Sequence, residues 1–88
     1  MTVAEMLALF QRHRVPEWFY VTDGRLGTGE CVGIERDGAR WRLYYSERGG
    51  KSPLGDFDSE DGAVRAMVSH VDSMLRQSGL SALPTTSG

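Results

Sequence analysis

The chain has 88 residues, 40% of them hydrophobic, and carries a formal net charge of −2. These values fit one small globular domain, exclude a disordered chain and argue against a protein whose main task is to coat nucleic acid. No stretch approaches the roughly 20 apolar residues of a membrane span. Cys31 is the only cysteine, so no internal disulfide can form and a cytoplasmic location is expected.

A first helix is predicted near the start of the chain. Thr2 and Glu5 match the T-x-x-E capping box. In this motif each of the two side chains accepts a hydrogen bond from the backbone N–H of the other residue. The apolar stripe that follows at helical spacing consists of Val3, Met6, Leu7 and Phe10. Pro16 ends the helix, and the basic residues 12–14 fall in its last turn, where they complement the helix dipole.

The aromatic and β-branched run from Glu17 to Thr22 is predicted to form a strand. The glycine-rich residues 23–29 form the next connection. They do not match a dinucleotide-binding fingerprint, because a strand and not a helix follows them.

Asp37-Gly38 lies between two alternating runs and indicates a hairpin with a two-residue type I′ turn. The pairs expected on one face are Ile34 with Trp41, Val32 with Leu43, and Glu30 with Tyr45. The pairs expected on the other face are Glu35 with Arg40, Gly33 with Arg42, and Cys31 with Tyr44. One face is apolar and the other mixed, which is typical of an antiparallel sheet covered on one side.

Gly50-Lys51-Ser52 has the look of the end of a phosphate-binding loop, but the rest of that motif is missing. Its first glycine would stand at position 45, which is Tyr45, and Pro53 follows where a helix should open. Residues 47–57 are therefore predicted to form a loop, with a short edge strand around Leu54 to Phe57.

A second helix is predicted to begin at a cap formed by Asp58 or Ser59, with Glu60 and Asp61 in its first turn. Its apolar stripe consists of Val64, Met67, Val68, Val71 and Leu75. Gly79 is a typical C-terminal stop.

These elements predict one α+β domain over residues 1–79, followed by a disordered tail over residues 80–88. The expected order is α-β-β-β-(β)-α. The expected architecture has two layers, an antiparallel sheet of three or four strands with both helices on its apolar face.

The sequence contains no constellation typical of catalysis or metal binding. His13 and His70 lie on different predicted helices, each without a second ligand at metal-binding spacing, and no sequence feature activates Cys31 as a nucleophile. The run from Asp56 to Gly62 departs from a calcium-binding loop, since Met67 stands where the last ligand belongs. We therefore expect no enzymatic activity, no cofactor and no metal.

Negative charge is concentrated in residues 56–61. A helix favours acidic residues in its first turn, which explains Glu60 and Asp61 well but Asp56 less well. Two interpretations remain open: a solvated helix start, or an acidic patch that faces a partner.

One motif spans residues 41–71: a strand that ends in the letters YYSERG, a short loop, then Phe57-x-Ser59-Glu60 at the start of the final helix. It resembles the C-terminal half of small bacterial immunity proteins of polymorphic toxin systems. Such proteins are cytoplasmic, non-enzymatic partners that bind and neutralise a toxin domain made by the same cell. Gly62 departs from the helix-forming residue expected in this motif.

The resemblance implies a cognate toxin domain as the protein partner and no membrane contact. Tyr44 would be an exposed anchor on the sheet, and Arg48 would pair with a partner carboxylate. The acidic residues that would meet basic groups of the partner are Glu47, Asp56, Asp58, Glu60 and Asp61. Alternatively, Glu47 and Arg48 hold their own loop and contact no partner.

A second hypothesis is a nucleic-acid-binding module. Arg40, Arg42 and Tyr44 alternate along one strand on the open sheet face, which suits stacking and phosphate contacts. The net charge and Glu35, expected opposite Arg40, argue against it. The oligomeric state stays open, since an uncovered sheet edge could pair with itself.

Overall fold

The computed structural model of the chain describes residues 1–22, 24 and 29–79. The expected tail, residues 80–88, and most of the expected connection 23–29 lie outside the described residues. The elements in chain order are α1 (Val3–Arg12), the 3-10 helix η1 (Glu17–Phe19), β1 (Tyr20–Val21), β2 (Cys31–Asp37), β3 (Arg40–Glu47), β4 (Gly50–Phe57) and α2 (Glu60–Gln77).

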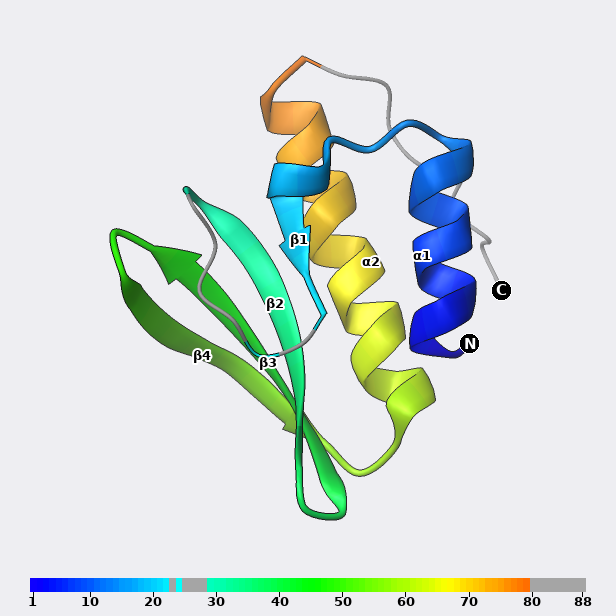
Figure 1. Ribbon diagram of the computed structural model, residues 1–88, viewed down its shortest axis with the longest axis vertical. Coiled ribbons are helices and arrows are strands. Elements are labelled where there is room, and N and C mark those ends of the chain that lie inside the picture. The colour runs from blue at the N-terminus through cyan, green and yellow to red at the C-terminus, as the bar shows by residue number, and fades with distance from the viewer. Residues whose placement is uncertain (23, 25–28, 80–88) are drawn as a thin grey trace.

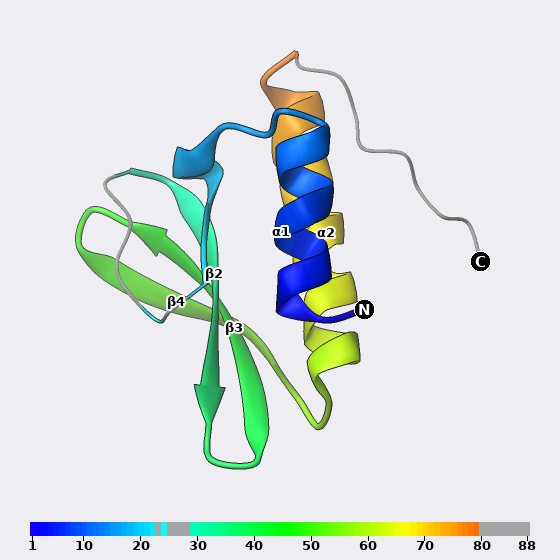
Figure 2. The same cartoon turned by 45° about the vertical axis from the view of Figure 1, so that its right-hand side comes forward.

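The chain folds into two layers, a four-stranded sheet and a pair of helices (Figure 1 and Figure 2). The strand order is β1-β2-β3-β4, in which β2, β3 and β4 are antiparallel and β1 is parallel to β2. Both helices lie on the same side of the sheet, and they run in the same direction (Figure 2). The predicted α+β class is therefore confirmed.

The first strand differs from the prediction. The run from Glu17 begins with a 3-10 turn, closed by a hydrogen bond from the Phe19 N–H to the Pro16 carbonyl at 3.0 Å. Pro16 favours this turn because its ring fixes φ, and the turn buries Phe19. Two residues remain for β1, and they pair with β2 in parallel instead of antiparallel.

Both helices begin at predicted caps. The Thr2 hydroxyl accepts from the Glu5 N–H at 3.1 Å, and the Glu5 carboxylate accepts from the Thr2 N–H at 2.8 Å, so the capping box is confirmed. Of the two candidate caps of α2, Ser59 fills the role: its hydroxyl accepts from the Gly62 N–H at 3.1 Å.

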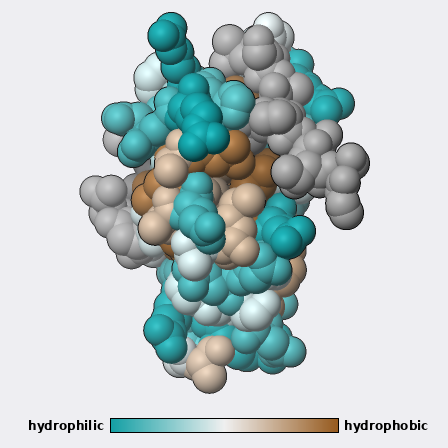
Figure 3. Space-filling view, turned by 90° about the vertical axis from the view of Figure 1, so that its right-hand side faces the viewer, coloured by the Kyte–Doolittle hydropathy of each residue, from teal (hydrophilic) through white to brown (hydrophobic). Residues whose placement is uncertain are grey.

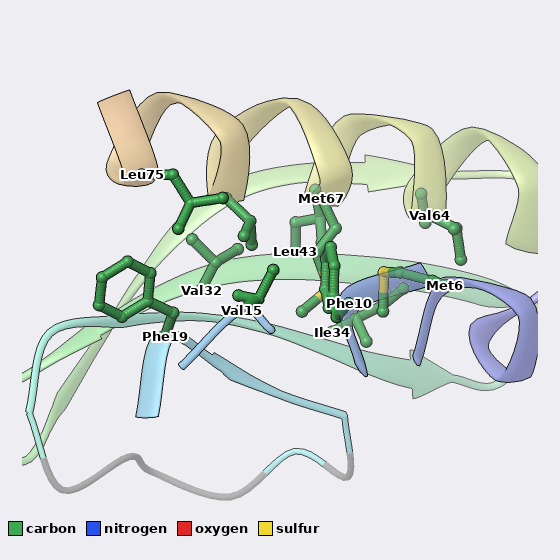
Figure 4. Packing of buried hydrophobic residues seen from close by; sticks show 12 residues of the cluster. Met6, Phe10, Val15, Phe19, Val32, Ile34, Leu43, Val64, Met67 and Leu75 are labelled. Atoms are coloured by element: carbon green, nitrogen blue, oxygen red, sulfur yellow. The ribbon is translucent and has the colours of Figure 1, made fainter. Parts of the chain in front are cut away.

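The core lies between the helices and the sheet (Figure 4). Its buried residues are Met6, Phe10, Val15, Phe19, Val32, Ile34, Leu43, Ala63, Val64, Met67, Val71 and Leu75. They come from every element except β1 and β4, whose contributions are half-buried aromatic rings at Tyr20 and Phe57. The two predicted helical stripes thus supply half of the core, and their other members Val3, Leu7 and Val68 are half-buried.

The β2–β3 hairpin has the predicted faces but a different register. Asp37 pairs with Arg40, so the turn is Gly38-Ala39, and Ile34 stands opposite Leu43 instead of Trp41. Gly38 has a φ of +63° at the first turn position, as a type II′ turn requires, and Asp37 stays in the ladder. Every pair shifts by two residues, and a shift of two leaves each side chain on its predicted face.

β4 is longer than predicted and includes the Gly50-Lys51-Ser52 triplet. Arg48 and Gly49 form the preceding turn with φ values of +50° and +77°, which fits a type I′ turn. The triplet therefore continues from a hairpin turn into a strand. A bulge between Leu43 and Tyr44 interrupts the register with β4.

Candidate functional site

The sheet face opposite the helices carries an ion-pair network centred on Arg42. Its guanidinium lies 2.8 Å from the Asp37 carboxylate, 3.2 Å from that of Asp56 and 3.8 Å from that of Glu35. The hydrogen bond to Asp56, together with the charge of Asp37, raises the pKa of Arg42 above its ordinary value. The Arg42 side chain thereby joins three strands, β2, β3 and β4, on this face.

Lys51 of β4 ties a second part of the same face together. Its Nζ lies 3.1 Å from the Glu35 carboxylate and 2.6 Å from the Gly24 carbonyl, and it stands 4.5 Å from the centroid of the Tyr44 ring. The lysine of the former phosphate-loop candidate therefore has a structural role.

Tyr44 is buried, with 1% of its surface exposed, which corrects the expectation of an exposed anchor or stacking platform. Its ring lies across Gly33: a Cβ at residue 33 would stand 2.0 Å from Tyr44 Cζ. A glycine opposite the tyrosine in the ladder leaves room for the ring to lie flat on the sheet. Alternation alone placed Tyr44 on the correct face but could not show that this face is covered there.

Arg40 and Arg42, the two arginines of the nucleic-acid hypothesis, are both engaged with carboxylates. Arg40 pairs with Asp58 at 2.9 Å, not with Glu35 as the predicted register implied. The stacking partner Tyr44 is buried beside them. The structure therefore does not bring these three residues together as an accessible nucleic-acid surface.

The acidic residues at the start of α2 also have partners within the chain. A Glu60 carboxylate oxygen accepts from the Val3 N–H at 2.8 Å. Asp61 pairs with Arg65 at 2.9 Å and with the Met1 ammonium group. Both partners lower the pKa of Asp61, and the Met1 ammonium group has the larger effect. Each acidic residue of the run from Asp56 to Asp61 therefore has a partner within the chain, Asp56 through Arg42 and Asp58 through Arg40.

Glu47 and Arg48 differ from the other predicted contact residues. Both are exposed at the β3–β4 turn. Within the part of the chain that the structure describes, neither side chain makes an ion pair or a hydrogen bond. The resemblance implied seven contact residues, and of these only Glu47 and Arg48 have no partner among the described residues. The alternative, in which these two side chains hold their own loop, has no contact among the described residues to support it.

The two residues belong to a longer exposed segment, which we name the β3–β4 arm: residues 47–54 are all exposed. Figure 1 shows this hairpin extending away from the helices. Leu54 has 38% of its surface exposed and is an apolar side chain on this arm. The sequence signal that could have indicated the arm is the lack of apolar alternation between Ser46 and Leu54.

The candidate chemical groups remain scattered. His13 and His70 are exposed on separate helices, and Cys31 is buried. Among the described residues, no group of three or more His, Cys, Asp or Glu side chains is placed to hold a metal ion. An open cleft of about 510 Å³ is lined by Val3, Thr22, Gly24, Glu35, Arg36, Trp41 and Glu60. The two acidic residues of this cleft already have partners in the chain: Glu35 pairs with Lys51, and Glu60 accepts from the Val3 N–H.

No family model, no curated protein and no solved structure matches the chain. No helix among the described residues is long and apolar enough to cross a membrane. The function has to be argued from the geometry of the surface.

Proposed function

We propose that the chain is a non-enzymatic protein-binding domain, an inhibitor of the immunity type that acts in the cytoplasm on a cognate toxin domain. The β3–β4 arm is its contact surface. The observation that carries this proposal is the uninterrupted exposure of residues 47–54, in a segment with regular backbone structure.

The arm is held in place before any partner binds. The ladder with β3 and the type I′ turn fix its backbone, and Lys51 anchors it to Glu35 and Gly24. A surface that is already ordered loses little conformational entropy on binding, which favours affinity. Pro53 and the bulge beside it interrupt the outer edge of β4, so we expect recognition through side chains and not through strand addition.

The chemistry of the arm fits a partner with both polar and apolar groups. Arg48 can form a bidentate pair with a carboxylate, and Glu47 can accept from a basic side chain. Leu54 takes the apolar role that Tyr44 was expected to fill. The toxin-directed part of the proposal rests on the resemblance over residues 41–71, and the geometry of the arm supports only the more general proposal of a protein partner.

The test is a pull-down with the tagged chain from its own cells, with and without nuclease. The variants are Glu47→Ala and Arg48→Ala, and Arg76→Ala in the last turn of α2 is the matched control. We expect one protein to co-purify at near-equal amounts, to survive nuclease, and to be lost with both arm variants but not with the control.

Two results would contradict the proposal. Capture that disappears on nuclease treatment would support the nucleic-acid hypothesis instead. A captured protein that both arm variants retain as well as the Arg76→Ala control would place the contact surface elsewhere on the domain.

A further inference from the structure

The connection between α1 and β1 carries the most exposed large apolar side chain of the described chain. Trp18, in η1, has 67% of its surface exposed. Arg12, His13 and Arg14, at the end of α1, are all exposed as well. A single exposed apolar side chain is common on protein surfaces, but tryptophan and arginine together are enriched in binding hot spots.

Arg14 has a left-handed backbone, with a φ of +55°. It follows the α1 cap His13, and the hydrogen bond from the Val15 N–H to the Phe10 carbonyl at 2.9 Å closes a Schellman-type end. Glycine is the preferred residue at this position because it has no Cβ. An arginine here costs stability, and such local strain often marks a functional residue.

The side chains of this connection are not used inside the fold. Within the described residues, Arg12 and Arg14 make no side-chain hydrogen bond or ion pair. Trp18 packs edge-on against the ring of its neighbour Phe19, with ring centroids 6.3 Å apart. A strained arginine and an exposed tryptophan without an internal role are best explained by an external ligand.

We infer that Arg12, Arg14 and Trp18, which we name the Trp18 corner, bind a short acidic segment of another protein that also carries an apolar side chain. The arginines pair with carboxylates in a bidentate manner, and the indole covers the apolar side chain. Three residues separate Arg14 from Trp18, so their Cα atoms lie at most about 14 Å apart. A peptide of five or six extended residues covers that span.

The surroundings favour a peptide over a nucleic-acid strand. A single strand needs a basic groove that follows its backbone over several nucleotides. Here the basic side chains of the connection are confined to residues 12–14, and Arg40 and Arg42 of the sheet are paired with Asp58 and Asp56. Figure 3 shows the side of the molecule that carries α1, where hydrophobic surface is bordered by hydrophilic surface.

The Trp18 corner is distinct from the proposed contact surface. Figure 1 shows the end of α1 and the β3–β4 turn at opposite sides of the molecule, with η1 between them, and the Trp18 corner shares no residue with the β3–β4 arm. The inference therefore stands without the proposed function, and it adds a second interface to the domain.

The test is an NMR titration of the isotope-labelled chain with the acetylated and amidated peptide Glu-Glu-Leu-Phe-Glu-Glu. The control peptides replace every Glu by Gln, or Leu-Phe by Gly-Gly. We expect shifts confined to residues 12–19, including the Trp18 indole N–H, with the acidic apolar peptide. Each control peptide is expected to bind more weakly.

Arg14→Gly is the sharpest variant. Because it relieves the left-handed strain, it should raise the melting temperature, and because it removes a charged donor it should weaken peptide binding roughly tenfold. Trp18→Ala should also weaken binding. Arg76→Ala, another exposed arginine at a helix end, should leave peptide binding unchanged.

Three outcomes would overturn the inference. These are no shifts at the corner up to millimolar peptide, equal binding of the Gln peptide, or an Arg14→Gly chain that gains stability and keeps its peptide affinity. Tighter binding of an oligothymidylate at the same residues would assign the corner to nucleic acid instead.

Discussion

A Glu60 carboxylate oxygen accepts a hydrogen bond from the Val3 N–H at 2.8 Å, which joins the first turns of α1 and α2 across 57 positions of sequence. The two helices run in the same direction (Figure 2), so their N-terminal ends lie together. Each end carries partial positive charge and unpaired N–H groups. A carboxylate shared between these ends offsets their repulsion and satisfies one of the free amides.

Replacing Glu60 should therefore destabilise the fold. We expect Glu60→Ala to lower the free energy of unfolding by about 1–2 kcal/mol, because a charge-assisted hydrogen bond and a favourable dipole contact are lost. Urea denaturation monitored by circular dichroism measures this. Glu47→Ala, which removes an exposed and unpaired carboxylate, is the control and should change stability little; equal losses in both would refute the role of Glu60.

The contact between Gly33 and Tyr44 predicts a second large effect. A methyl group at residue 33 would stand 2.0 Å from Tyr44 Cζ, so the buried ring must move. We expect Gly33→Ala to cost about 1–3 kcal/mol, as overpacking of a core does. Gly29→Ala meets no atom within 4 Å and is the matched control. A Gly33→Ala chain as stable as the control would show that Tyr44 is not fixed there.

The cap of α2 can be assigned by two substitutions. Ser59→Ala removes the acceptor of the Gly62 N–H and should cost about 1 kcal/mol. Asp58→Ala removes only an exposed ion pair with Arg40 and should cost less than about 0.5 kcal/mol. Chemical denaturation of the two variants compares them directly, and the reverse order would assign the cap to Asp58.

The capping box of α1 makes stability depend on pH. The hydrogen bond from the Thr2 N–H lowers the pKa of Glu5. A carboxyl with a lowered folded-state pKa stabilises the fold above its unfolded pKa, and the contribution disappears as the pH falls through the folded value. Glu5→Gln should therefore be less stable than the parent chain at neutral pH, with a difference that shrinks below the ordinary range of a glutamate.

Urea midpoints for both chains at several pH values measure this difference. Glu17→Gln, at an exposed position in η1, is the control. A difference between the Glu5→Gln chain and its parent that stays constant with pH would mean that the charge of Glu5 contributes nothing at the cap.

Most of the secondary structure could be predicted because its signals are local. The caps at Thr2 and Ser59 and the apolar stripes of the helices depend on residues three or four positions apart, which the sequence displays directly. The faces of β2 and β3 follow from an alternation of period two. The predicted faces are therefore correct, although the predicted register is wrong by two residues. The core was thereby largely determined by the sequence itself.

The surface was decided by tertiary contacts between residues far apart in the chain. The sequence left open whether the acidic run faces a partner, and the fold pairs Asp56 with Arg42, Asp58 with Arg40 and Glu60 with Val3. Tyr44 was expected to be exposed, but its ring is buried and lies against Gly33. The pairing of charges and the covering of a sheet face depend on which strands become neighbours, and short-range patterns carry no information about that arrangement.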